Sequence, residues 1–151
     1  MPSRTRPGDA PPTPMIGALL RLPHEAVVAR LMEALRREGL ELSLTELSVF
    51  LFPGPEGRSP SDLARQCGMT RQAMNYVLSG LEEEGHLQRR DADASNGRVV
   101  RTTVRGRRVI RVLRAEVAQV EQEWAGYLGR VRYRQLRDSL TDLAHWLGKL
   151  G

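Results

Sequence analysis

Residues 59–106 decide the fold, and they read SPSDLARQCGMTRQAMNYVLSGLEEEGHLQRRDADASNGRVVRTTVRG. Ser59 and Pro60 predict the start of a short helix, because serine is a preferred N-cap and proline fits the first helical position. Gly68 ends this helix and permits a tight turn, after which a second helix is predicted over residues 71–84. Two short helices joined by such a turn predict a helix-turn-helix motif.

The second helix of this motif has two different faces. Thr70 can cap the helix and Gly85 closes it. Its apolar face carries Met74, Val77, Leu78 and Leu81. Its polar face carries side chains that can pair with guanine or adenine edges or hold phosphates, namely Arg71, Gln72, Asn75, Tyr76 and Ser79. For this helix alone, a plain solvated face is the simpler interpretation.

A basic hairpin follows the second helix. We expect strands over residues 87–90 and 98–103, joined by a polar loop over residues 91–97. Between residues 87 and 111 eight arginines face two aspartates, a local charge of +6 in a chain whose net charge is +5. A solvated loop explains this charge as well as a phosphate-contacting surface does. The hairpin and the polar helix face together, however, make one coherent surface for double-stranded DNA.

The segments before the motif predict an arm and a helical region. Residues 1–14 contain five prolines and almost no large apolar side chain, so we expect a disordered arm. Residues 15–42 are predicted to hold a dimerisation helix, which Pro23 opens or kinks and which runs over residues 24–38. Ser43 and Glu46 then have the spacing of a capping box, which starts a short helix that ends before Pro53.

The last segment, residues 107–151, predicts two more dimerisation helices. Thr103 can cap a long helix whose apolar stripe is Val109, Leu113, Val117, Val120, Trp124, Leu128 and Val131. A final amphipathic stretch carries Leu136, Leu140, Leu143 and Leu147. Because a long terminal helix has little of its own domain to pack against, the stripe predicts a seam with a partner helix in a symmetric homodimer.

A set of residues in a fixed order resembles a known family: Leu63-Ala64, Gly68, residues 70–75, Leu81-Glu82, Gly85, Arg89-Arg90, Thr103 and Gly106. The family is the MarR family of bacterial transcriptional regulators, and the resemblance covers nearly everything after residue 14. It implies a mainly α fold with a small β-wing, that is, a winged helix-turn-helix lobe over residues 43–106 between N- and C-terminal dimerisation helices. It also implies a homodimer that binds a pseudo-palindromic operator, usually as a repressor, and that a small aromatic effector or an oxidant can release.

The wing departs from the family pattern, which has an Asp-x-Arg motif there. The nearest match is residues 96–98, Asn-Gly-Arg, and Thr102-Thr103 follows sooner than in the family. We therefore expect Arg98 at the wing tip, in the minor groove. The arginines expected to contact the DNA backbone are Arg89, Arg90 and Arg101. The resemblance further implies an effector pocket between lobe and dimer body, for which we predict His24, Val27 and Phe50 as lining.

Other classes of protein find little support in the sequence. No apolar run is long enough to span a membrane, and the single cysteine, Cys67, excludes an internal disulfide and fits the cytoplasm. We interpret Cys67 as a small core residue rather than a redox switch. The three histidines lack metal-ligand spacing, and no phosphate loop or nucleophile motif is present, so we expect neither a metal, a cofactor nor an enzyme. The main alternative is a winged-helix interaction module that binds an acidic protein partner rather than DNA.

Overall fold

The computed structural model describes residues 13–91 and 97–149. Most of the predicted N-terminal arm and the tip of the predicted hairpin loop therefore lie outside the described residues. The described elements, in chain order, are α1 (Ile16–Arg37), α2 (Leu44–Phe50), α3 (Pro60–Gln66), α4 (Arg71–Glu83), β1 (Leu87–Asp91), β2 (Arg98–Thr102), α5 (Val104–Leu128) and α6 (Arg130–Trp146). The predicted fold class, mainly α with a small β-wing, is confirmed.

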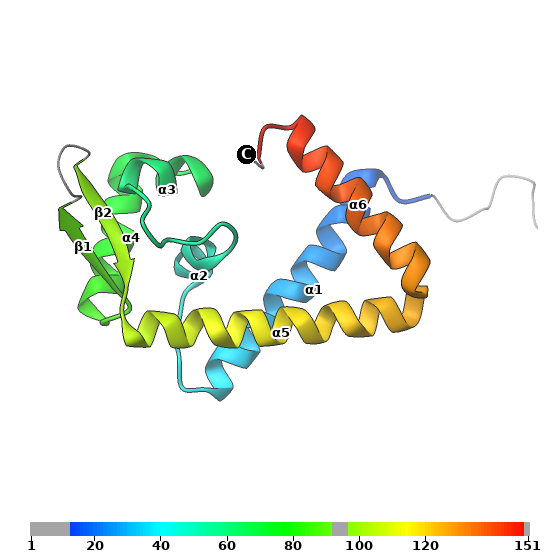
Figure 1. Ribbon diagram of the computed structural model, residues 1–151, viewed down its shortest axis with the longest axis horizontal. Coiled ribbons are helices and arrows are strands. Elements are labelled where there is room, and N and C mark those ends of the chain that lie inside the picture. Colours follow the sequence, from blue (N-terminus) through cyan, green and yellow to red (C-terminus); the bar gives the residue numbers. More distant parts are fainter. Residues whose placement is uncertain (1–12, 92–96, 150–151) are drawn as a thin grey trace, which may run out of the picture.

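The elements form two parts joined by α5, which runs along one side of the molecule (Figure 1). The segment from α2 to β2 packs together at one end, and we call it the lobe. Helices α1 and α6 and the second half of α5 make up the rest, which we call the helical body. β1 and β2 pair antiparallel, with Leu87 opposite Thr102 and Asp91 opposite Arg98.

Four helices of the chain begin at a capped residue, as the sequence predicts. Ser43 accepts a hydrogen bond from the Glu46 amide while the Glu46 carboxylate accepts one from the Ser43 amide, which completes the capping box. Ser59, Thr70 and Thr103 cap α3, α4 and α5 in the same way, each accepting from the amide three residues later. These local bonds set where the elements of the lobe start.

The structure corrects two helix boundaries. Pro23 lies inside α1 rather than at its start, because α1 begins at Ile16. Its missing N–H leaves only the Leu19 carbonyl without a helical partner, and this part of the helix is exposed, so water can serve that carbonyl. Val131 belongs to α6, not to the long helix, because Gly129 breaks the chain direction with φ +82°.

Only part of the apolar stripe of α5 is buried inside the chain. Val109, Leu113 and Val120 are buried within their own chain, so the prediction that the whole stripe forms a partner seam is wrong. The main contact of α5 inside the chain is with α1. α6, in contrast, has no buried residue, and its apolar side chains Val131, Leu136, Leu140 and Leu143 are exposed, as is Leu147 directly after the helix.

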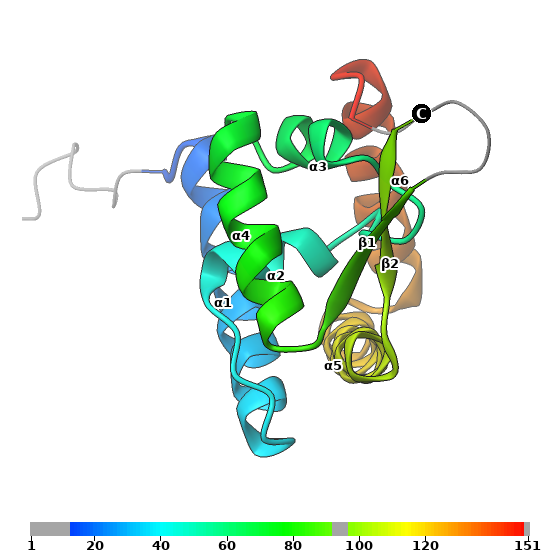
Figure 2. The ribbon, with the colours of Figure 1, turned by 90° about the vertical axis from the view of Figure 1, so that its left-hand side faces the viewer.

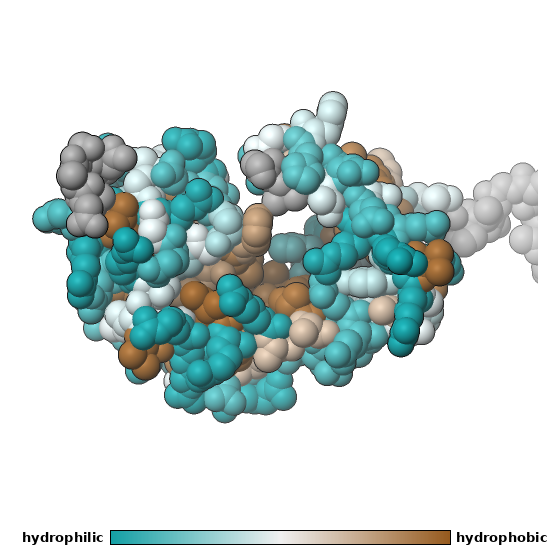
Figure 3. Space-filling view, viewed as in Figure 1, coloured by the Kyte–Doolittle hydropathy of each residue, from teal (hydrophilic) through white to brown (hydrophobic). Residues whose placement is uncertain are grey.

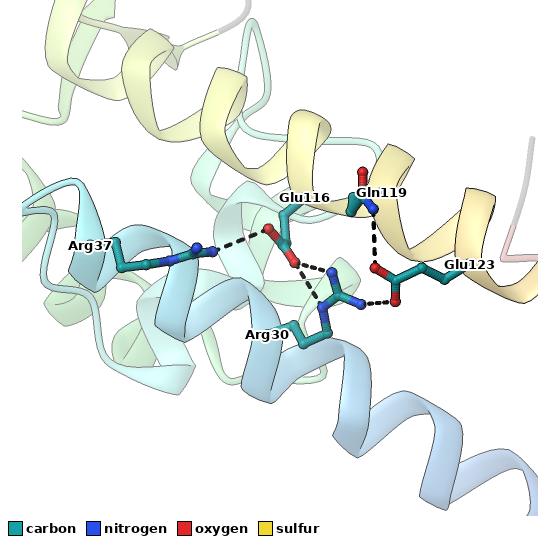
Figure 4. A network of polar contacts seen from close by, with 5 residues as sticks. All are labelled: Arg30, Arg37, Glu116, Gln119 and Glu123. Carbon is teal, nitrogen blue, oxygen red and sulfur yellow. Dashed lines mark hydrogen bonds and ion pairs between the residues drawn. The ribbon is translucent and has the colours of Figure 1, made fainter.

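An ion-pair network joins α1 to α5 on the side away from the core (Figure 4). The Arg30 guanidinium donates to Glu116 at 2.6–2.7 Å and also pairs with Glu123, while Arg37, two turns further along α1, reaches Glu116 at 3.4 Å. The hydrogen bond from Arg30 lowers the pKa of Glu123. Two helices held by a network of charges keep a fixed angle better than two held by a single exposed pair.

His86 connects the lobe to the start of α5 through a close backbone contact. Its side chain is 0% exposed and meets Phe50 edge-on, with ring centroids 6.3 Å apart. Neither ring nitrogen has a hydrogen-bond partner among the described residues. Gly106 in α5 packs directly on the His86 carbonyl, where a Cβ would lie 2.1 Å from the oxygen.

We expect the protein to lose stability in mild acid because of His86. Burial, together with the positive charge of Arg105, lowers the pKa of His86 from its ordinary value of 6.5, and the Glu46 carboxylate only partly opposes this. Glu84 lies 3.5 Å from Nε2, but its side chain is half exposed and does not offset burial. The unfolded chain therefore binds a proton more readily than the folded one, so this contribution to stability is complete above pH 6.5 and falls away below it.

Urea unfolding at pH 7.5 and pH 5.5 measures this effect. In His86→Phe, which keeps an aromatic ring against Phe50, the free energy of unfolding should change less between the two pH values than in the wild type. Equal pH dependence in the two proteins would mean that His86 is not the responsible group.

Candidate nucleic-acid interface

α4 is anchored on one side and open on the other. Met74, Leu78 and Leu81 are 0% exposed and hold the helix against the core of the lobe. Arg71, Gln72 and Tyr76 lie on the opposite side and are exposed, Tyr76 to 84%. Figure 2 shows α4 at the surface of the lobe, beside the β-hairpin. A rigid helix with a free polar face has the geometry of a helix that enters a major groove.

Asn75 and Ser79 occupy the edge of α4 that faces the hairpin. Both side chains are half buried, and both contact Arg89 of β1. The five α4 residues predicted to contact DNA thus divide into an exposed group and a group held by the neighbouring strand. The sequence, which placed all five on one polar face, did not distinguish the two groups.

The register of the hairpin decides which way its arginines point. Leu87 and Val100 are buried, so residues 87, 89 and 91 face the lobe with residues 98, 100 and 102. Arg90 and Arg101 lie on the other face and are exposed. Arg89 and Arg90, which the sequence analysis grouped as equivalent backbone contacts, therefore point in opposite directions.

Arg89 is bound on several sides within the protein. Its guanidinium lies 2.6 Å from the Glu82 carboxylate and donates to the Ser79 hydroxyl at 2.9 Å. The Arg89 amide also donates to Glu82, at 2.7 Å. Burial alone would raise the pKa of Glu82, but the hydrogen bonds and charge of Arg89 outweigh it and hold that pKa below its ordinary value. Glu82 therefore anchors β1 to α4.

The remaining arginines of the hairpin are accessible. Arg98 is 69% exposed and has Asp91 across the strand pair at 3.6 Å. Arg101 is about half exposed and lies 3.2 Å from Glu56 in the loop before α3. Burial of Glu56 would raise its pKa, but hydrogen bonds from Thr102 and Arg101 lower it overall. The residues of the predicted wing tip between Asp91 and Gly97 lie outside the described residues.

A groove that the sequence did not predict runs along α4. It has a volume of about 890 Å³, and α2 supplies its far wall. The two helices lie close at Gly80, where a Cβ would meet the Glu46 carboxylate at 3.6 Å, an ordinary contact distance. The polar residues that α2 adds to this side of the lobe are Ser43, Thr45 and Glu46. The capping box located the start of α2, but its position beside α4 depends on packing across more than twenty residues.

The three residues predicted to line an effector pocket are not brought together. Phe50 lines a cavity of about 380 Å³ between the loop after α2 and the middle of α5, with Ile110, Leu113 and Val117. Val27 lines a separate cavity of about 200 Å³ between α1, α5 and α6. His24 is exposed and lines neither cavity. Figure 3 shows apolar surface in the hollow between the lobe and α6.

The other candidate residues have structural surroundings. Cys67 is half buried against the core, and its thiol lies 3.6 Å from the Ser48 carbonyl oxygen. Over residues 13–91 and 97–149, no three acidic, histidine or cysteine side chains are grouped as metal ligands. In the same part of the chain, no helix is both long and apolar enough to cross a membrane.

Comparisons with known proteins agree with this geometry. Residues 40–98 match the sequence model of the MarR family. No curated protein matches the chain significantly. Among solved structures, the Mycobacterium tuberculosis MarR family protein Rv2887 in complex with salicylic acid is 28% identical, with a TM-score of 0.60 over 87% of this chain and 97% of that one. Its complex with DNA gives 26% identity and a TM-score of 0.63, over 87% and 98% of the two chains.

Two further structures share the fold. A MarR family transcriptional regulator from Rhodococcus sp. RHA1 is 24% identical, with a TM-score of 0.65 over 85% of this chain and 91% of that one. CouR from Rhodococcus jostii RHA1, bound to p-coumaroyl-CoA, is 23% identical, with a TM-score of 0.63 over 86% and 91%.

Fold and surface together define a winged helix-turn-helix protein: α3 and α4 form the motif and the β1–β2 hairpin forms the wing. Over residues 40–98 the chain matches the MarR family, and its fold is that of solved MarR family DNA-binding transcriptional regulators.

Proposed function

We propose that the protein binds a pseudo-palindromic DNA operator as a homodimer, through α4 and the hairpin of each copy, and that it represses transcription there. The observation that carries this proposal is the combination on one side of the lobe of an anchored helix with a free polar face and a hairpin with exposed arginines. Two copies of α4 would enter successive major grooves about 34 Å apart. The DNA complex of Rv2887, which is 26% identical, supports this use of the fold.

The homodimer part of the proposal is supported by apolar side chains that the single chain leaves uncovered. They lie on α6 and on the first turns of α1: Ile16, Leu19, Leu20, Leu22, Val131, Leu136, Leu140, Leu143, Trp146 and Leu147, each at least 40% exposed. An exposed apolar surface of this kind marks an interaction site. Because α1 and α6 both belong to the helical body, pairing of two bodies would leave both lobes free for DNA.

The proposal also includes release by a small aromatic acid, in the cytoplasm. The cavity beside Phe50 is mainly apolar, and its charged lining residues are Arg114, which supplies a positive charge for a carboxylate, and the acidic Glu56 and Glu121. The cavity is lined by both the loop after α2 and α5. A ligand bound there would therefore change the position of this loop relative to α5. Titration with salicylate, followed by the thermal midpoint and by the affinity for DNA, tests this part. An unchanged midpoint at millimolar salicylate would rule out salicylate as an effector.

Selection from random duplexes with the purified protein tests DNA recognition. We expect enrichment of one sequence with two-fold symmetry, and binding to it that survives an excess of unrelated DNA and weakens steeply with salt. Absence of an enriched sequence, together with equal binding to polyglutamate, would instead support the acidic-partner module.

Two substitutions separate base reading from backbone binding on the selected duplex. Gln72→Ala should reduce the discrimination between bases at particular positions by about 1–3 kcal/mol, because an amide that pairs with a base edge is lost. Arg101→Ala should weaken binding to all sequences alike, because a phosphate contact carries no sequence information. Fluorescence anisotropy with single-base variants of the duplex measures both. If Gln72→Ala left every base preference unchanged, the exposed face of α4 would not be the reading surface.

A further inference from the structure

We propose that Arg89 is a positioning residue for α4, the recognition helix. It fixes the orientation of Asn75 and Ser79 for DNA and does not itself contact a phosphate. The inference rests on the proposed function, since it concerns how α4 reads its operator. It assigns a different role to Arg89, whose side chain contacts α4.

The direction of the Arg89 side chain follows from the strand. Successive residues of β1 point to opposite faces, and Arg89 shares its face with the buried Leu87. The Arg89 side chain is only 20% exposed, although it belongs to a basic hairpin. The hairpin itself lies between Arg89 and a phosphate on the outer face of the wing.

The donors of Arg89 are used inside the lobe. Nε and Nη2 lie 2.8 and 2.6 Å from Glu82 Oε2, so the positive charge is neutralised by a carboxylate in a charge-assisted pair. Nη2 also donates to Ser79 Oγ at 2.9 Å, and Nη1 donates to Asn75 Oδ1 at 3.5 Å. One planar group thus spans three residues of α4, at one-turn intervals along the helix.

This arrangement fixes what Asn75 and Ser79 can offer to DNA. A guanidinium has donors and no acceptor, so Asn75 must face it with its carbonyl oxygen, and the amide nitrogen is left to donate outward. Ser79 accepts from Arg89 through Oγ, which leaves its hydroxyl proton free to donate. Base edges in the major groove and phosphate oxygens both supply acceptors for such donors.

Arg90 provides a matched comparison one residue away. It is exposed on the outer face of the hairpin and donates to the neutral Gln88 Oε1 at 3.0 and 3.2 Å. Its charge is therefore available for a phosphate. The two neighbouring arginines should affect DNA binding in different ways.

The test uses the full chain, the duplex selected by the wild type, and its single-base variants. Arg89→Lys keeps the charge but loses the fork, and we expect it to reduce the base preference at the positions affected by Asn75→Ala by about tenfold. In the double variant Glu82→Gln with Arg89→Met, which removes both charges of the pair, the slope of log affinity against log salt should equal that of the wild type. Arg90→Met should instead keep every base preference and reduce the magnitude of the slope by about 0.9.

Each outcome separates the two roles. A wild-type base preference in Arg89→Lys, or a slope reduced by about 0.9 in the double variant, overturns the positioning role. If circular dichroism shows that the double variant is unfolded, Arg89→Lys alone decides. A wild type that selects no sequence contradicts the proposed function, and this inference with it, whereas selection with unchanged preference in Arg89→Lys contradicts only the inference.

Discussion

Gly106→Ala should lower the free energy of unfolding by about 3 kcal/mol or more, the upper range for an overpacked site. A Cβ at this position would lie 2.1 Å from the His86 carbonyl oxygen and 3.2 Å from its carbon. Both are backbone atoms and cannot turn away as a side chain would. The His86 amide is bonded to the Leu81 carbonyl at 2.8 Å, and the His86 oxygen accepts from the Thr103 amide at 3.1 Å. To admit one methyl group, α5 would have to separate from the lobe.

Gly126→Ala is the matched control, because it adds the same methyl group to the same helix. A Cβ at Gly126 meets nothing within 4 Å. Alanine is also the better helix former, so stability should stay equal or rise by up to about 1 kcal/mol. Urea unfolding at one fixed protein concentration compares the two variants. Equal midpoints for Gly106→Ala and the wild type would show that the start of α5 yields easily and that the close contact does not constrain the lobe.

Leu140→Glu combined with Leu143→Glu should make the protein monomeric and reduce its affinity for the symmetric operator by a factor of about 100 or more. Both leucines lie on the apolar face of α6 and are 40% and 51% exposed, so neither belongs to the buried core, and only Leu140 also lines the small cavity between α1, α5 and α6. Two carboxylates on that face would have to be buried when two copies pair, which is costly without partners. A monomer holds only one half-site and loses the gain that comes from linking two binding events.

Thr141→Glu combined with His145→Glu is the control for charge on α6. Both positions are exposed and point away from the side of the helix that carries Leu140 and Leu143. This variant should stay dimeric and bind the operator as the wild type does. Sedimentation equilibrium gives the assembly state, and anisotropy gives the affinity. A leucine variant that stays dimeric at micromolar concentration would place the dimer contact elsewhere.

Local sequence signals predicted the lobe well because they act over three or four residues. The capping serines and threonines, Gly68 and the glycine after α4 each place one end of an element, and the structure has these ends within a residue or two. The polar face of α4 follows from helical spacing alone, and the exposure of Arg71, Gln72 and Tyr76 agrees with it. The match to the MarR family likewise lies almost entirely within the lobe, over residues 40–98.

Contacts between elements could not be predicted from the sequence. Strand alternation predicts that Arg89 and Arg90 point in opposite directions. The local sequence does not predict, however, that Arg89 binds Glu82 and Ser79 on the neighbouring helix. The stripe of α5 has one period along its length, although α1 and the lobe bury part of it and the rest is only half buried. Cavities such as the one beside Phe50 are spaces between elements, so no pattern of residues along the sequence predicts them.

The length of α5 gives small angles a large effect. With 25 residues the helix is about 37 Å long, and it begins beside the hairpin and ends beside α6. A tilt of about 5° at one end moves the other end by about 3 Å, close to the roughly 3.4 Å between successive base pairs along a strand. In a dimer joined through the helical bodies, the tilt angle of α5 therefore determines whether both recognition helices can bind their half-sites at the same time. Side chains far from any base, such as Arg30 and Glu116 where α5 crosses α1, would then influence which operator spacing the protein accepts.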